Sequence, residues 1–242
     1  MAPELRSLAL VDPPARWEAL GFEVTDGVVA FDHVCLRLGA GAPSLGRSRN
    51  STVFEPAADL GEKPLVESRK SSGSGEQATN VGFLSSAEVG ISEVAVADLD
   101  GVPLVTAADT PDPSVHPNGV IGIDHFVIVT PDFDRTAAAL DAAGMPFRRV
   151  RDAGGFRQGF RRLGPAILEV VEALKMPPGP ARFWGLTFVA SDLDQLAALL
   201  GDRLHAPKEA VQPGRRIATL DRSAGLSVPV AFMTPESGQS RS

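Results

Sequence analysis

The chain has 242 residues, 43% of them hydrophobic and 22% charged, a composition ordinary for a globular protein with a sizeable core. Its net charge of −7 is concentrated in residues 1–115, where 8 Lys/Arg face 17 Asp/Glu, and this argues against a nucleic-acid partner because phosphates need a basic face. One cysteine excludes an internal disulfide, and no apolar run approaches a signal peptide or the ~18 residues of a membrane helix. We therefore expect a cytoplasmic protein with no membrane partner.

Residues 1–110 predict a degenerate β-α-β-β-β region. Residues 5–11 are typical of a strand, 13–22 of a helix with proline at its start, and 28–39 of a hairpin, and 91–101 would supply the last strand. Residues 40–80 are rich in Gly, Ser, Pro and charge, so we expect a mobile loop there. Three prolines in 108–119 indicate a semi-rigid connector. The pattern leaves open whether this region is a true copy of the units that follow.

An internal repeat dominates residues 119–236. Asp132 and Asp134 recur 60 residues later as Asp192 and Asp194. Each pair follows an apolar run typical of a strand, 123–129 or 185–190, and suits the N-cap and first turn of a helix. Short extended runs then follow at 147–151, 156–163 and 166–172 in the first copy, and near 204–211, 215–220 and 228–233 in the second. We therefore predict two β-α-β-β-β modules, 120–173 and 181–236.

Apolar positions define the buried faces of the two predicted helices. Leu140 marks that face in the first copy, and Leu196, Leu199 and Leu200 mark it in the second. Gly144 ends the first helix, as a glycine after the last turn often does.

The motifs IDHFVIVTPDFD, the helix ending at Gly144 and LGPAILEVVE at 163–172 resemble the vicinal oxygen chelate superfamily, which includes glyoxalase I, extradiol dioxygenases and bleomycin-resistance proteins. The likeness covers 120–236 well and 1–110 weakly. It implies an α+β, glyoxalase-like fold in which paired β-α-β-β-β modules form a cup-shaped sheet. It also implies a homodimer, since family members often complete their cups by dimer formation.

The resemblance also places metal ligands on the first and last strand of each module. His125 matches the first-strand position and Glu169 the last-strand position, and Glu93 would be a third ligand if the N-terminal copy pairs with residues 120–172. In the second module the corresponding residues are Gly185 and Ala231, which ligate no metal and should leave space. We therefore expect either no cofactor or a single divalent metal.

Alternation along the strands predicts which side chains line the cup. The expected ligand-binding residues are His125, Val127, Phe160, Glu169, Gly185, Thr187 and Ala231. The same parity sends Trp184 and Phe232 to the core. We expect the arginines on or beside the predicted strands to face solvent or to bind an anion; they are Arg157, Arg161, Arg162, Arg215 and Arg216. His33, His116 and His205 read as loop or strand-edge residues.

Three functions fit these patterns. The favoured one is a glyoxalase-like protein that binds a small organic molecule in the cup without full metal chemistry, as bleomycin-resistance proteins do. The alternative is a metal-dependent lyase, isomerase or dioxygenase of the same superfamily, with Glu169 or Glu172 as the candidate base. A third is an interaction module that recruits a partner through the acidic N-terminal half. Only two of the four metal-ligand positions that the resemblance implies are filled, which favours binding of an organic molecule over metal chemistry.

Overall fold

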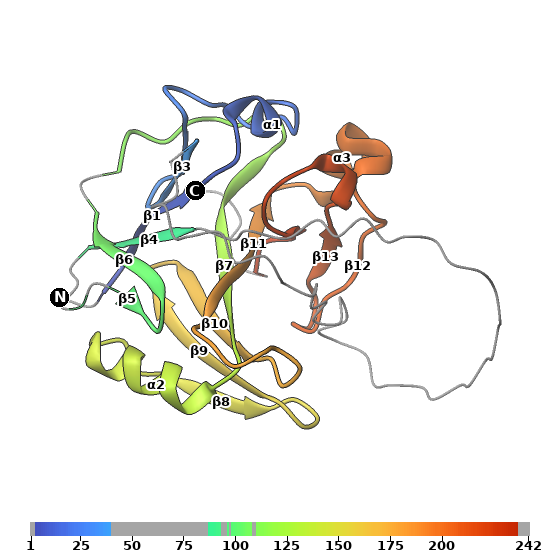
Figure 1. The fold of residues 1–242 in the computed structure, drawn as a ribbon. Coiled ribbons are helices and arrows are strands. Elements are labelled where there is room, and N and C mark those ends of the chain that lie inside the picture. Colours follow the sequence, from blue (N-terminus) through green and yellow to red (C-terminus); the bar gives the residue numbers. More distant parts are fainter. Residues whose placement is uncertain (1–2, 40–86, 93–95, 97, 108–109, 237–242) are drawn as a thin grey trace, which may run out of the picture.

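The computed structural model describes residues 3–39, 87–92, 96, 98–107 and 110–236, which form two β-sheets and few helices (Figure 1). The six-stranded sheet has the order β2-β3-β1-β4-β6-β5 and the eight-stranded sheet the order β12-β13-β14-β11-β7-β10-β9-β8. Within the described residues, no helix is long and apolar enough to cross a membrane. The predicted mobile loop at 40–80 lies outside the described residues.

The eight-stranded sheet contains the two predicted modules. The first module consists of β7 (Val120–Thr130), α2 (Phe133–Ala142), β8 (Arg149–Asp152), β9 (Arg157–Leu163) and β10 (Ala166–Glu172). The second consists of β11 (Arg182–Ala190), α3 (Leu193–Leu200), the short helix η1 (Gly201–Arg203), β12 (Lys208–Glu209), β13 (Arg216–Thr219), the short helix η2 (Arg222–Ala224) and β14 (Val230–Met233).

Pairing of the strands joins the two modules into one sheet. In each module the first strand pairs in parallel with the last, β7 with β10 and β11 with β14. The two first strands, β7 and β11, pair with each other in antiparallel orientation. This is the α+β arrangement of paired β-α-β-β-β modules that the sequence predicts.

The repeated aspartates begin the two helices, as predicted. The side chain of Asp132 accepts a hydrogen bond from the backbone N–H of Arg135, and Asp192 accepts two in the same way at the start of α3. Leu140, Leu196 and Leu200 are buried. Leu199 is 52% exposed, so its predicted place on the apolar face is wrong. It falls outside the buried stripe of α3, whose residues are Leu193, Leu196 and Leu200.

The N-terminal sheet repeats the pairing pattern of the larger one. Its elements are β1 (Leu5–Leu10), α1 (Pro14–Glu18), β2 (Val28–Ala30), β3 (Cys35–Leu38), β4 (Glu88–Ile91), β5 (Asp98–Leu99) and β6 (Val102–Thr106). β1 pairs in parallel with β3, β4 pairs in parallel with β6, and β1 and β4 pair in antiparallel orientation. The central strands β13-β14-β11-β7-β10-β9 of the larger sheet have the same order and orientations.

This arrangement differs from the single N-terminal copy that the sequence predicts. The predicted hairpin at 28–39 is present as β2 and β3. Of the range 91–101, expected to supply the last strand, Ile91 ends β4, which pairs with β1 in antiparallel orientation, and Asp98–Leu99 form β5; the parallel position beside β1 belongs to β3. The division of the chain at residue 110 stays a prediction.

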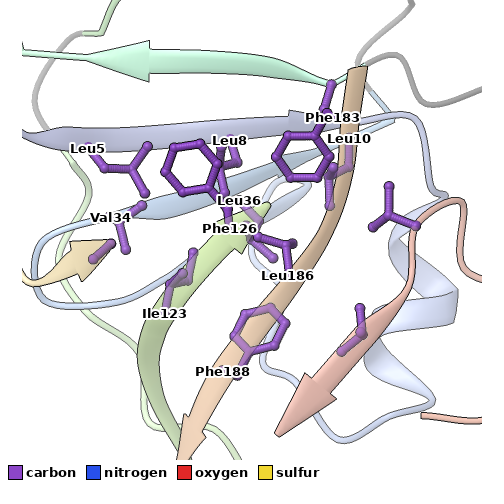
Figure 2. Packing of buried hydrophobic residues seen from close by; sticks show 14 of the residues in the cluster. Leu5, Leu8, Leu10, Val34, Leu36, Ile123, Phe126, Phe183, Leu186 and Phe188 are labelled. Carbon is purple, nitrogen blue, oxygen red and sulfur yellow. The ribbon is translucent and has the colours of Figure 1, made fainter. Parts of the chain in front are cut away.

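One continuous hydrophobic core joins the two sheets. Leu5 and Leu8 of β1 lie close to Phe126 and Phe183 of the larger sheet (Figure 2). Trp17, Phe22 and Phe31 bring their rings within 5.3–5.9 Å of the ring of Phe188 on β11. The N-terminal region is thus packed onto the face of the eight-stranded sheet that also carries α2 and α3, which leaves the opposite face for a site.

Candidate functional site

Strand register aligns the predicted lining residues in rows on the face of the eight-stranded sheet opposite the main core, called here the cup face. One row runs across five strands through Arg149, Phe160, Glu169, Val127 and Gly185. The next runs through Arg162, Ile167, His125, Thr187 and Ala231. Paired residues on neighbouring strands project to the same side of a sheet. The seven predicted lining residues therefore share one face.

A buried ion pair fixes the orientation of His125. Its Nδ1 lies 2.8 Å from Oδ2 of Asp124, and Oδ1 of Asp124 accepts a hydrogen bond of 2.5 Å from Nη2 of Arg215. Arg215 also donates through Nε to the carbonyl of Thr234. Burial alone would raise the pKa of Asp124, but the hydrogen bonds from His125 and Arg215 outweigh it and lower this pKa. Asp124 therefore orients the ring of His125 through Nδ1 and leaves Nε2 for a ligand.

Sequence reasoning missed Asp124 because strict alternation would place it opposite His125. The register between β7 and β11 shifts by one residue between the pairs Thr187–His125 and Phe188–Ile123. This irregularity brings two consecutive side chains to the same region of the sheet. A carboxylate inside an apolar strand was the available signal, because buried charges are normally paired.

Glu169 is held by a second polar chain from the outer strands. It is 7% exposed, and its Oε1 accepts a hydrogen bond of 3.0 Å from Nε2 of Gln158. The amide oxygen of Gln158 in turn accepts from Nε of Arg151, whose guanidinium lies over the ring of Phe160. Burial raises the pKa of Glu169, and the positive charges of His125 and Arg151 oppose this rise. Among the described residues no second partner engages Glu169, so its Oε2 is available to a ligand.

A groove lies at the start of β7, at the rim where the eight-stranded sheet meets the N-terminal region, and none of the seven predicted lining residues is part of its lining. The groove has a volume of about 190 Å³ and runs between Gly122, Asp124 and Ile167 on one side and residues 31–34, the turn between β2 and β3, on the other. At the opposite end of β7 the cup face is filled by a small apolar cluster, which comprises Val127, Val129, Val171, Ala173 and Met176 with Phe156 and Trp184 packed against it. The contribution of the turn at 31–34 was not foreseen from the sequence.

Two expectations about the second module need correction. The space expected at Gly185 is absent, because an added Cβ would lie 2.8 Å from the carbonyl oxygen of Pro229. Trp184 does not join the main core, since a register shift between Phe183 and Gly185 sends Phe183 to the core and Trp184 to the cup-face cluster. Ala231 is partly exposed on the cup face. Phe232 is buried in the main core, as expected.

Glu172, the other candidate base, lies apart from Glu169. It occupies the core-side position of β10 and accepts hydrogen bonds from Arg157, with Nη2 of Arg157 2.7 Å from its Oε1. The side-chain hydrogen bond from Arg157 lowers the pKa of Glu172. Arg157 also pairs with Asp134 and lies over the ring of Phe133. This network ties β9 and β10 to α2.

The donor atoms on the cup face do not fit a complete metal site. His125 and Glu169 each leave one atom, Nε2 and Oε2, for a ligand. In the part of the chain that the structure describes, no group of three or more His, Cys, Asp or Glu side chains is placed to hold a metal ion. Bound transition metals usually have three or four protein ligands. Glu93 lies outside the described residues, so its role as a third ligand stays a prediction.

Comparison with solved structures gives low-identity matches to about half of the chain. Methylmalonyl-CoA epimerase from Mycobacterium tuberculosis matches 49% of this chain and 91% of its own at 20% identity and a TM-score of 0.40. A methylmalonyl-CoA epimerase in complex with methylmalonyl-CoA and NH4+ matches 50% of this chain and 98% of its own at 21% identity, also at 0.40. A hypothetical protein from Bacillus halodurans matches 49% and 97% at 15% identity and a TM-score of 0.39. No protein-family model matches the sequence, and no curated protein does.

Proposed function

We propose that the chain is a glyoxalase-like protein of the vicinal oxygen chelate type, whose cup face binds a small organic molecule. The observation that carries this proposal is the groove at the start of β7, whose lining includes Ile167, Val189 and Asp124, the hydrogen-bond partner of His125, while His125 and Glu169 lie beside it on the same strands. The lining also holds the charged side chains of Arg162 and Glu236, and a combination of apolar walls with oriented polar groups is typical of an organic-ligand site. The ion pair of Asp124 with Arg215 supports the same reading, because it orients His125 in advance of binding.

Blocking the cup face tests the proposal. Ala231 lies in the row of His125 and Thr187 and is partly exposed, so a phenyl ring there should cover the face without overpacking the core. A compound library is screened by thermal shift against the wild type, Ala231→Phe and the control Val211→Phe, which adds the same ring at a 50% exposed position. We expect hits to be lost in Ala231→Phe and kept in the control. Hits that bind all three proteins equally would place the site elsewhere.

A second function, proton transfer on a bound carbon acid, is favoured by the surroundings of Glu169. This carboxylate is buried, its Oε2 is available, and it is a diagonal neighbour of His125 on the adjacent strand. A carboxylate whose pKa is raised by burial is a stronger base than one in water, and suits removal of a proton beside a carbonyl group. Glu169 would take the proton and return it, and the ring of His125, held by Asp124, would position the bound compound beside it.

Solvent exchange distinguishes a binding protein from this enzyme. Carbonyl compounds that bind are incubated with the protein in D2O, and loss of their C–H signals is followed by NMR. We expect exchange with the wild type and none with Glu169→Gln, which keeps the size of the side chain. Exchange that persists in Glu169→Gln would exclude Glu169 as the base. Binding to the wild type without exchange would support a binding protein and exclude proton transfer.

A further inference from the structure

Two arginines on the outer strands of the cup face point to the chemical class of the ligand. Arg149 on β8 is paired with Phe160, and Arg162 on β9 is paired with Ile167, so both side chains project to the face that carries Glu169. Arg149 and Arg162 are diagonal neighbours across the β8–β9 pair, which places their backbones about 7–8 Å apart, within reach of two long side chains. Their guanidinium groups can therefore converge on one group of a ligand.

Neither arginine has a carboxylate partner among the residues that the structure describes. Arg162 donates to the carbonyl of Pro165, a neutral group. Two other arginines of the eight-stranded sheet are instead paired with acids, Arg157 with Glu172 and Arg216 with Asp194.

The hairpin that contains these two arginines, residues 147–163, is strongly basic. It has six arginines and one aspartate in a chain whose net charge is −7. Like charges at neighbouring positions on one face of a sheet repel each other. A bound anion between Arg149 and Arg162 would remove that repulsion.

We propose that the ligand of the cup face is an organic anion whose carboxylate or phosphate group is bound jointly by Arg149 and Arg162. The rest of the molecule lies over Ile167 and reaches toward His125 and Glu169, so this inference rests on the proposed function. Strands in a sheet are about 4.8 Å apart, which puts the anionic group roughly 5–10 Å from the carboxylate of Glu169. The planar guanidinium group of arginine binds both kinds of anion through paired hydrogen bonds.

Arg151 has a different part in this arrangement. Its Nε donates to the amide oxygen of Gln158, and its guanidinium rests over the ring of Phe160. These contacts commit Arg151 to holding Gln158 and, through it, Glu169. The ligand's anionic group is therefore assigned to Arg149 and Arg162.

Calorimetric titration of the full chain at low salt, with inorganic phosphate and with succinate in separate arms, tests the inference. We compare the wild type with Arg149→Gln, Arg162→Gln and the control Arg37→Gln, which removes an exposed arginine from β3 of the other sheet. Loss of one charge-assisted hydrogen bond weakens binding about tenfold or more. We expect that loss in both cup-face variants and no change in the control. Tighter binding of phosphate identifies a phosphorylated ligand, and tighter binding of succinate identifies a carboxylic acid.

The inference is overturned if neither anion binds the wild type, or if both cup-face variants bind as tightly as the wild type. Its failure is distinguishable from failure of the proposed function. If neutral compounds bind the wild type and the arginine variants equally but do not bind Ala231→Phe, the cup-face site stands and an anionic ligand is excluded. If the anions bind only when both arginines are present, and no compound loses binding in Ala231→Phe, the arginine site stands and ligand binding elsewhere on the cup face is excluded.

Discussion

Removal of the Asp124 carboxylate should destabilise the protein strongly, because it leaves the charge of Arg215 buried without a partner. The two side chains are 11% and 5% exposed, and their ion pair has an N–O distance of 2.5 Å. Loss of one member of a buried pair usually costs about 3–5 kcal/mol. Arg215 keeps its bond to the carbonyl of Thr234, whereas His125 also loses its acceptor, so we place Asp124→Ala within this range.

Urea denaturation followed by tryptophan fluorescence measures the effect, since Trp17 is fully buried in the main core. The matched control is Asp194→Ala, which breaks the exposed ion pair of the very next arginine, Arg216. We expect no measurable change there, because exposed pairs are screened by solvent.

A double variant, Asp124→Leu with Arg215→Met, completes the cycle. Removal of both charges should recover most of the stability lost in Asp124→Ala, since no buried charge remains. A loss below about 1 kcal/mol in Asp124→Ala, or equal losses in Asp124→Ala and Asp194→Ala, would show that Asp124 and Arg215 do not form a stabilising buried ion pair.

Three further predictions concern packing, pH and metal content. Gly185→Ala should lower the unfolding free energy by about 1–3 kcal/mol, because the added Cβ contacts the Pro229 carbonyl. The control Gly122→Ala on β7 should be tolerated, because an added Cβ there meets nothing within 4 Å. Equal denaturation midpoints for the two variants would contradict this prediction. Burial lowers the pKa of His116, so protonation favours the unfolded chain, and the unfolding free energy should fall as pH drops below about 6.5. His116→Gln should flatten that part of the pH profile, and an unchanged profile would assign the dependence to other groups. Elemental analysis should find no stoichiometric transition metal, and about one ion per chain that His125→Ala releases would overturn this expectation.

The modules of the eight-stranded sheet were predictable because local signals define them. Asp132 and Asp192 are N-caps with side-chain hydrogen bonds, and the run at 166–172 coincides with β10. Alternation along β7 and β10 was enough to place His125 and Glu169 on one face.

The features that sequence reasoning missed depend on non-local contacts. The register shifts that bring Asp124 beside His125, and Trp184 to the cup face, arise from the pairing of β7 with β11. Strict alternation has no way to include such an extra residue.

The N-terminal sheet and the connector show the same limit. β1 pairs with β4, whose sequence separation of about 80 residues carries no local signal. His116 was expected to be a loop residue, and it is, but it is also buried. Its Nδ1 accepts from the backbone of Glu23 and its Nε2 lies 3.1 Å from the carbonyl of Ala30, contacts that tie the connector to the N-terminal sheet.

The most direct test of the central proposal is NMR chemical-shift mapping of the isotope-labelled full chain with a compound from the library screen. We expect the perturbed signals to cluster around His125, Ile167 and Arg162 and to include the turn at 31–34 that completes the groove. Perturbations confined to the six-stranded sheet, or to the core-side face of β10 around Glu172, would contradict the assignment of the site.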